Sequence, residues 1–247
     1  MLSQWVTTMP RIEVENLTVK YGGRRILDSV NAVFDSGVHV ILGRNGAGKT
    51  TLLRAMAGLV EFTGNIRIDG RSIKNLGRRE LSRIVAYCWQ NPFYGFIEVS
   101  VRDEIEAILK TLRVPGDRYI TSALVPGHLM DRDPTTLSGG EARRVSLASI
   151  LVADQPVWLL DEPFTNLDRD GIEALLKIVE HGRRKGKTIV ISLHEVFYAH
   201  LLNPDTYTVI NGGKTVGGGS WGSITNEVLI NSGLLTLGDV CASLYNR

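Results

Sequence analysis

Short apolar runs alternate along this chain with longer amphipathic stretches. Residues 11–19 alternate polar and apolar side chains with a period of two, which is typical of a half-buried strand. The patterning predicts further strands at residues 38–42, 83–89, 157–161 and 188–192, and helices at residues 49–58, 101–112, 139–152 and 171–181. Strands that alternate with helices in this way indicate an α/β fold with a mostly parallel sheet covered on both faces.

Two stretches differ from this alternation. Residues 91–153 have helical patterning and no clear strand, so we expect a helical subdomain inserted into the α/β core. Residues 206–210 and 214–216 predict a hairpin around residues 211–213, and the glycines at 217–219 predict a loop.

The ends of the chain carry weaker signals. Residues 1–9 are interpreted as a tail, with Met9 as an alternative start, and residues 220–247 as a C-terminal appendage without an assigned role. The N-terminus has no basic segment followed by an apolar run, so we expect no signal peptide. Residues 1–247 are then expected to form a single domain.

Composition narrows the class of protein. Hydrophobic residues make up 43% and charged residues 22%, the balance of a globular chain. The 28 Lys and Arg nearly balance the 26 Asp and Glu, so we expect no nucleic-acid partner. The longest stretch without these residue types, residues 84–97, is shorter than the roughly 20 residues of a membrane helix. Cys88 and Cys241 form no metal-type pair, so a reduced, cytosolic compartment is expected.

A glycine-rich segment joins the strand predicted at 38–42 to the helix that follows it. It fits the pattern G-x-x-x-x-G-K-[ST] with Gly43, Arg44, Asn45, Gly46, Ala47, Gly48, Lys49 and Thr50. Glycines let backbone N–H groups point at a β-phosphate, and the helix N-terminus adds partial positive charge. We expect Lys49 to reach the β- and γ-phosphates and Thr50 to bind Mg²⁺. Thr51 is also expected to bind the nucleotide. The segment predicts a nucleoside triphosphate site.

An acidic pair ends the apolar strand predicted at residues 157–161. Burying a carboxylate is costly unless something pairs with it, so Asp161 and Glu162 at this position suggest a cation or a site. Open α/β sheets bind ligands at the carboxyl edge of their strands. We expect Asp161 to hold Mg²⁺ and Glu162 to act as the general base toward water. Alone, the pair would equally suit a turn or the start of a helix.

A third motif begins the helix predicted at residues 139–152 and consists of Leu137, Ser138, Gly139, Gly140 and Glu141. Together with the first two motifs it makes the chain resemble the ATP-binding-cassette (ABC) ATPases, from about residue 11 to residue 216. In that family this signature motif closes over the γ-phosphate held by a second subunit, so the resemblance implies that Ser138 to Glu141 act in trans. The family usually has Gln at the fifth position, and Glu141 is expected to be a mild departure that flanks the phosphate contact.

The resemblance implies roles for four more residues. Tyr21 matches the aromatic residue that stacks on adenine, although an ordinary strand-end tyrosine is the alternative. Gln90 matches the loop glutamine that reaches Mg²⁺ and the attacking water, and Asp168 lies in the loop that crosses the dimer interface. His194 matches the switch histidine that contacts the γ-phosphate. The implied catalytic residues are Lys49, Gln90, Glu162 and His194, and the implied metal ligands are Thr50, Gln90 and Asp161.

The family also implies a fold and an activity. The expected fold is a P-loop NTPase core with N-terminal antiparallel strands and an inserted helical subdomain. ATP and Mg²⁺ are the expected cofactors, and ATP hydrolysis by a dimer with a second ABC ATPase subunit is the expected reaction. The expected role is to power transport through a separate transmembrane permease, from the cytoplasm at the inner face of the cell membrane. The alternative is a soluble ABC ATPase, for example one that assembles iron–sulfur clusters.

The aromatic residues that follow Gln90 bear on this choice. Phe93, Tyr94, Phe96 and Ile97 lie in the region that receives a membrane subunit in ABC transporters, or else form the core of the helical subdomain. The sequence Gln90-Asn-Pro92 is similar to that of energy-coupling-factor and cobalt-type importers. The cargo and the direction of transport have no signal in the sequence.

Overall fold

The computed structural model describes residues 9–236 and 238–239. Most of the predicted tail (residues 1–8) and Cys241 lie outside this part. The strands are β1 (Ile12–Tyr21), β2 (Arg24–Phe34), β3 (Gly37–Leu42), β4 (Thr63–Ile68), β5 (Arg71–Ser72), β6 (Val85–Cys88), β7 (Val157–Asp161), β8 (Thr188–Leu193), β9 (Thr206–Asn211) and β10 (Lys214–Ser220). The α-helices are α1 (Lys49–Met56), α2 (Arg78–Ile84), α3 (Val101–Leu112), α4 (Arg118–Leu124), α5 (Gly139–Leu151), α6 (Arg169–Arg184), α7 (Val196–Leu202) and α8 (Asn226–Asn231).

The described strands form two sheets. One sheet has the order β2-β1-β4-β5, and its strand pairs are antiparallel. The other has the order β10-β9-β3-β8-β7-β6, in which only β10 is antiparallel to its neighbour. The predicted α/β fold, with a mostly parallel sheet and antiparallel N-terminal strands, is confirmed.

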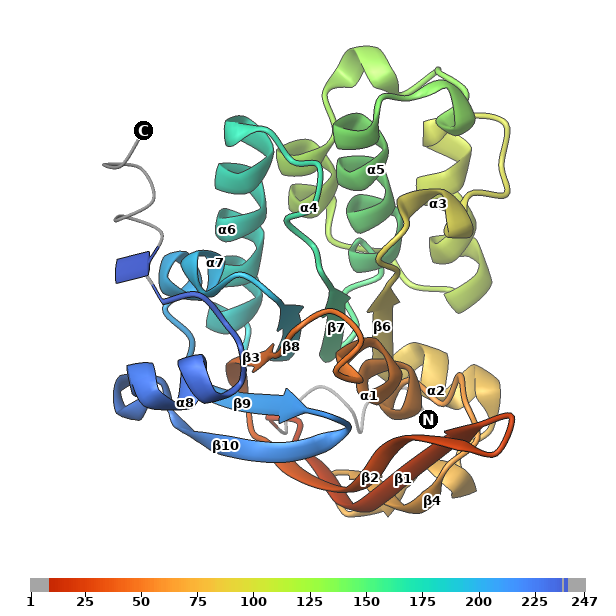
Figure 1. The fold of residues 1–247 in the computed structure, drawn as a ribbon. Coiled ribbons are helices and arrows are strands. Elements are labelled where there is room, and N and C mark those ends of the chain that lie inside the picture. The colour runs from red at the N-terminus through yellow and green to blue at the C-terminus, as the bar shows by residue number, and fades with distance from the viewer. Residues whose placement is uncertain (1–8, 237, 240–247) are drawn as a thin grey trace.

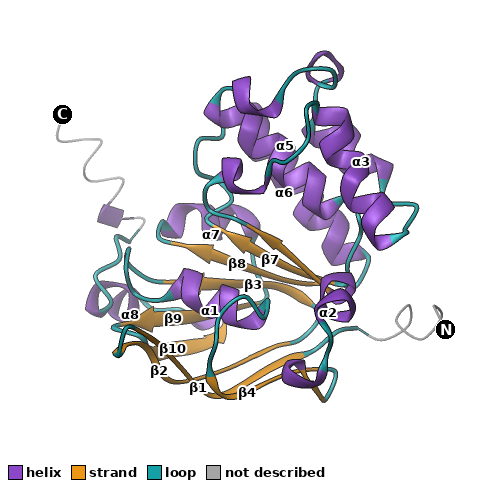
Figure 2. Ribbon diagram, turned by 90° about the vertical axis from the view of Figure 1, so that its right-hand side faces the viewer, coloured by secondary structure: helices purple, strands orange, loops and turns teal. Residues whose placement is uncertain are grey.

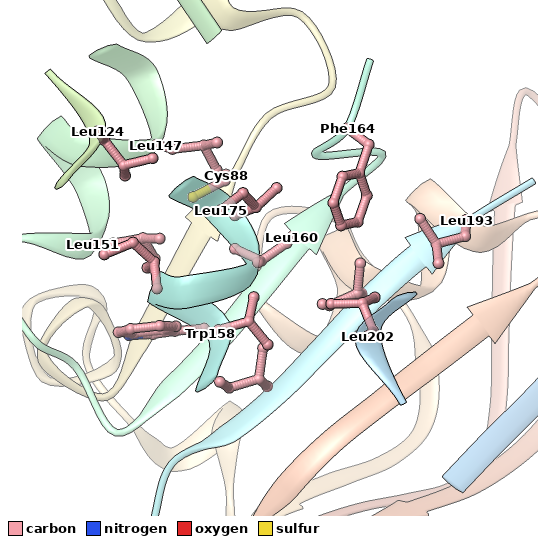
Figure 3. Close-up of a cluster of buried hydrophobic side chains, with 14 of the residues drawn as sticks. Cys88, Leu124, Leu147, Leu151, Trp158, Leu160, Phe164, Leu175, Leu193 and Leu202 are labelled. Carbon is pink, nitrogen blue, oxygen red and sulfur yellow. The ribbon is translucent and has the colours of Figure 1, made fainter. Parts of the chain in front are cut away.

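The sheets and helices are arranged in layers (Figures 1 and 2). Helices α3, α5 and α6 lie above the six-stranded sheet in Figure 2, and the antiparallel sheet lies below it, with α1 packed between the two sheets. Side chains of the central strands therefore alternate between two apolar clusters. Val40 and Leu42 of β3 face the helices, whereas Ile41 faces the antiparallel sheet. Figure 3 shows part of the first cluster, where Trp158 of β7 packs beneath helical leucines.

The parallel strands place their carboxyl ends side by side at one edge of this sheet. The neighbouring strands β3, β8 and β7 end at Leu42, Leu193 and Asp161, and each is followed by a segment in which the sequence predicts functional residues. The fold therefore brings together segments that are far apart in the sequence.

Residues 89–156, all of which the structure describes, form helices and turns without a strand. They comprise α3, α4 and α5, drawn in yellow to green at the top of Figure 1. Helix α5 packs against α3 and α4. Beyond β10, the described part of the predicted appendage contains a 3-10 turn at Trp221–Ser223 and helix α8.

Three details of the sequence prediction are wrong. Arg83 and Ile84 end helix α2 rather than begin a strand, so the strand predicted at 83–89 is confined to Val85–Cys88. The glycines at 217–219 belong to β10, where they pair with β9. Strands β2, β4 and β5 have no counterpart among the predicted strand ranges. In β2, bulges opposite β1 and a left-handed Ser29 break the period of two that signals a strand.

Candidate functional site

The glycine-rich segment between β3 and α1 has a backbone that only glycine tolerates at key points. Gly46 and Gly48 have φ values of 80° and 111°, in the left-handed region. A Cβ atom at Gly43 would lie 2.4 Å from the carbonyl oxygen of Ile210. Helix α1 begins at Lys49 directly after Gly48, which has no side chain to cap the helix. Its first N–H groups are thus available to an anion.

Lys49 lies at the centre of this loop. Its ammonium donates to the carbonyl of Gly43 at 2.8 Å and to that of Arg44 at 3.3 Å, so the loop curls around the charge. The same Nζ forms an ion pair with Oε1 of Glu162 at 3.1 Å, and both side chains are buried. A buried cation thus lies where the motif predicts the phosphates to bind.

Asp161 accepts hydrogen bonds from three hydroxyl groups. Oδ1 accepts from Thr50 at 3.0 Å and from Ser192 at 2.7 Å, and Oδ2 accepts from Tyr87 at 3.2 Å. The carboxylate is fully buried, so these donors compensate its loss of water. Burial and the neighbouring carboxylate raise the pKa of Tyr87, which stays a donor.

Glu162 is held by its backbone as well as by its side chain. Its φ of 48° places a non-glycine residue in the left-handed region, at a cost of about 1–2 kcal/mol. Its N–H donates to Oγ of Ser192 at 3.0 Å. Oε2 lies 2.7 Å from Nδ1 of His194, opposite the ion pair with Lys49. Backbone strain that the surroundings enforce is typical of a functional residue.

These contacts bring the predicted residues Lys49, Thr50, Asp161, Glu162 and His194 into one cluster. Thr50 and Asp161 supply the hydroxyl and carboxylate oxygens that Mg²⁺ prefers. In the described residues, no group of three or more His, Cys, Asp or Glu could hold a metal by itself. A cation with few protein ligands, completed by phosphates, is the arrangement that fits.

Gln90 and Tyr21 lie at the margin of this arrangement. Gln90 follows β6 and is exposed, and Tyr21 is the last residue of β1 and is 45% exposed. Of the contacts that the structure describes, none joins either side chain to the cluster.

The predicted signature motif begins helix α5 and caps itself. Ser138 is the N-cap residue, and Glu141 completes a capping box. Oε2 of Glu141 accepts from the Ser138 N–H at 2.8 Å and from its hydroxyl at 2.7 Å. Hydrogen bonds from the side chain and the backbone of Ser138 hold the pKa of Glu141 below its usual range. Glu141 therefore contacts Ser138 itself, through a capping box that either Glu or Gln can form.

A neighbouring loop supports this turn. Asn166, with a φ of 65°, packs against Gly139 and Gly140, and a Cβ at Gly140 would lie 2.9 Å from its carbonyl oxygen. Asp168 caps helix α6 by accepting from the N–H of Gly171 at 2.8 Å. No described contact joins Ser138 or Asp168 to the Lys49–Glu162 cluster, so the chain presents two separate groups of motif residues.

Sequence reasoning missed Ser192 and Tyr87, which fix Asp161. A polar residue near the carboxyl end of each apolar strand was the available signal. It also missed the contact of the C-terminal segment with the phosphate loop. Gly233 lies so close to Arg44 that a Cβ would be 2.6 Å from its Cδ. Residues 233–236 line a pocket of about 660 Å³ together with Arg44, Asn45 and residues 194–197.

A phosphate loop with a buried lysine, beside an acidic strand end on a mostly parallel sheet, defines a P-loop nucleotide-binding domain. The ABC transporter family profile matches residues 27–165. A putative ABC transporter ATP-binding protein of Pyrococcus furiosus is 35% identical over 193 residues, which are 75% of this chain and 74% of that protein. The energy-coupling factor transporter ATP-binding protein EcfA1 of Thermotoga maritima is 31% identical over 218 residues, 85% of this chain and 82% of that protein.

A solved structure agrees with these relatives. The cbiO1 protein of Clostridium perfringens, described as part of the ABC transporter complex cbiONQ, superposes with a TM-score of 0.71. It is 26% identical and covers 95% of this chain and 98% of its own. The chain belongs to the ABC transporter family as an ATP-binding domain.

Proposed function

We propose that this chain hydrolyses MgATP and uses the energy to drive transport through a separate membrane subunit. The observation that carries the hydrolytic part is the position of Glu162. Its carboxylate lies between Lys49 and His194, beside the phosphate loop. A buried carboxylate held between a phosphate-binding cation and a histidine suits a general base that acts on water near the terminal phosphate.

Different residues of the cluster would bind the phosphates, hold the metal and orient the attacking water. Lys49 and the N–H groups at the start of α1 would bind the β- and γ-phosphates. Thr50 and Asp161, with Gln90 from the adjoining loop, would hold Mg²⁺, which when bound neutralises phosphate charge. Once a γ-phosphate accepts from Lys49, Oε1 of Glu162 loses its partner and can orient water, while His194 keeps hold of Oε2.

The two separate groups of motif residues support a dimer. Ser138 caps a helix of its own, and no described contact connects it to the phosphate loop of the same chain. A second subunit would bring its signature serine to the γ-phosphate bound here, and this chain would bring Ser138 to the one bound there. Tyr21 would stack on the adenine, where its exposed ring is accessible.

The surface that follows Gln90 supports a membrane partner. Tyr94, Ile97 and Val99 are 70%, 81% and 81% exposed. Only Phe96 of the predicted aromatic group packs against the main apolar cluster, so the alternative that all four form the core is wrong. Exposed apolar side chains in one short segment are typical of an interaction surface. None of the described helices has the length and apolar character to cross a membrane.

The subgroup of transporter is also a proposal. The Thermotoga maritima relative is named as an energy-coupling factor subunit, and the Clostridium perfringens protein as part of cbiONQ. A similar role for this chain would place it at the cytoplasmic face of the membrane, bound to a permease. The soluble alternative, such as iron–sulfur cluster assembly, has no observation in its favour.

The substitution Glu162→Gln tests the hydrolytic mechanism. The amide cannot accept a proton from water, so steady-state turnover should fall by about 10²–10⁴-fold. ATP binding, measured by equilibrium titration, should stay within about twofold. Glu173→Gln on the exposed face of α6 is the matched control and should retain turnover. Unchanged turnover in Glu162→Gln would remove Glu162 as the base.

The transport role needs a separate test. The tagged chain would be captured from gently solubilised native membranes and its partners identified by mass spectrometry. A stoichiometric polytopic membrane protein is the expected result. Only soluble partners, without membrane association, would favour the soluble alternative.

A further inference from the structure

One buried arginine connects the helix of the signature motif to the strand ends of the active site. Arg143 lies on α5 and is 1% exposed. Its Nη1 donates to the carbonyl of Trp89 at 2.5 Å, directly before Gln90. Its Nη2 donates to the carbonyl of Asp161 at 3.1 Å and to the carbonyl of Glu162. A single guanidinium thus holds the ends of β6 and β7 together.

These contacts are unusual for a buried cation. Among the described residues, no carboxylate forms an ion pair with Arg143, and its acceptors are backbone carbonyls. The neighbouring Cys88 gives no counter-charge, because burial raises the pKa of its thiol to about 12. Burial lowers the pKa of the Arg143 guanidinium, because loss of water disfavours its charged form. A charge removed from water destabilises the fold unless its contacts compensate. Apolar packing alone therefore does not explain why an arginine occupies this buried position.

The contact with Glu162 completes the restraint of that residue. Ser192 holds the N–H of Glu162, and Arg143 holds its carbonyl, on either side of a left-handed Cα. The orientation of the carboxylate toward Lys49 and His194 therefore depends on groups from β8 and from α5. A shift of about 1 Å in a reacting group can cost about a hundredfold in rate.

Arg143 also lies close to the start of its helix. It follows the N-cap Ser138 by five residues, about 7.5 Å along the axis. Helix α5 is continuous from Gly139 to Leu151 in the described structure (Figure 2). The start of α5 is thus connected, through one helix and one side chain, to the carbonyls of Trp89 and Glu162.

We propose that Arg143 is a positioning residue, which holds the backbone of Glu162 and the turn before Gln90 and so links the signature helix to the catalytic carboxylate of the same chain. The expected effect on kcat rests on the proposed hydrolysis. The expected effect on the orientation of Glu162 rests on the geometry alone. Arg143 touches neither nucleotide nor water in this scheme. It acts through Glu162.

The test compares Arg143→Gln with Arg144→Gln in the full chain. Arg144 is the next residue of α5 and also donates to a backbone carbonyl, that of Leu124 at 2.7 Å, away from the strand ends. We expect Arg143→Gln to lower kcat about a hundredfold with the Kd for ATP within about twofold. Arg144→Gln should retain kcat within about twofold, and Arg143→Lys, which keeps a charged donor, should recover part of the loss.

A double-mutant comparison separates positioning from general loss of structure. In the Glu162→Gln background, Arg143→Gln should reduce the residual hydrolysis by less than about twofold, because its effect passes through Glu162. Thermal unfolding of all variants shows whether they fold. Equal fractional losses in both backgrounds, or losses in Arg143→Gln and Arg144→Gln that follow their stability, would overturn the proposal.

A second readout does not depend on hydrolysis. The ¹⁵N resonances of the His194 ring report its contact with Glu162, and His194→Gln assigns them. Arg143→Gln should shift them and Arg144→Gln should not. If the wild-type chain fails to hydrolyse ATP while this shift is seen, the proposed function fails and the positioning role stands. If hydrolysis is normal and Arg143→Gln changes neither kcat nor the resonances, only the positioning role fails.

Discussion

Helices α1 and α5 both begin in glycine-containing motifs of the predicted nucleotide site, and they begin differently. Helix α1 follows Gly48, which cannot cap it, and its first residue is a buried lysine that the loop surrounds. Helix α5 begins at a complete capping box, with the carboxylate of Glu141 hydrogen-bonded to Ser138. The first start is open to an anion, and the second already holds one.

This difference has an energetic consequence for the two contacts with nucleotide. A phosphate that reaches α1 meets N–H groups without a side-chain cap, and Lys49 exchanges its carboxylate partner Glu162 for another anion. A phosphate that reaches α5 must take the Ser138 hydroxyl from Glu141 and approach a carboxylate. We therefore expect the phosphate loop to bind ATP in a single chain, and the signature contact to be weak until two chains meet around the nucleotide.

The largest effect on turnover is expected when the uncapped start of α1 loses the cation of Lys49. Lys49→Met removes the ammonium from the loop and leaves Glu162 without its buried partner, so turnover should fall by about 10³-fold or more and ATP binding should weaken. Hydrolysis assays and equilibrium titration measure both. The control is Lys177→Met, an exposed lysine of α6. Retained turnover in Lys49→Met would contradict the assignment of the phosphate site.

A smaller effect is expected when the capped start is blocked. Ser138→Arg places a bulky side chain where a second subunit would bring its phosphate, so turnover should fall about 10–100-fold with ATP binding unchanged. The control Ser122→Arg, at an exposed position of α4, should leave turnover unchanged. Mixing Ser138→Arg with Lys49→Met should restore part of the turnover. In a mixed dimer, one of the two sites combines the native Lys49 of one chain with the native Ser138 of the other. Absence of recovery would argue against two identical subunits acting in trans.

The smallest effect concerns the charge of the cap. Because its hydrogen bonds lower the pKa of Glu141, the cap stabilises the fold fully above the ordinary value of 4.5 and loses this effect as pH falls through the lowered pKa. The amide that Glu141→Gln introduces does not titrate. The unfolding midpoint of the wild type should exceed that of Glu141→Gln by about 1–2 °C at neutral pH, and the gap should close below about pH 4.5. A gap that stays constant down to about pH 3 would show that the carboxylate does not stabilise the cap.

The sequence predicts local features of the site better than distant ones. The phosphate loop, the acidic strand end and the signature turn are each encoded in a few consecutive residues, and the order of strands brings the first two together. Ser192 and Tyr87 reach Asp161 from other strands, so their roles depend on how β6 and β8 align with β7. Pairwise contacts of this kind leave little trace in the hydrophobic pattern.

The same limit explains the errors in the fold. The alternation that reveals β1 is lost in β2, where bulges place two residues opposite one. The glycines of β10 suggested a loop, although Tyr207 and Val228 approach them so closely that larger side chains would be crowded. In both cases a neighbouring segment determines the conformation, and the local sequence does not.

The placement of the site across several parallel strands also affects how the chain unfolds. Segments after β3, β7 and β8 meet only when the six-stranded sheet is assembled, so a nucleotide that contacts all three binds the native state alone. At a concentration about one hundred times its Kd, such a ligand adds about 2.7 kcal/mol to the free energy of unfolding by mass action. Slower amide hydrogen exchange on adding ATP should then extend through the central strands, well beyond the residues that touch the phosphates.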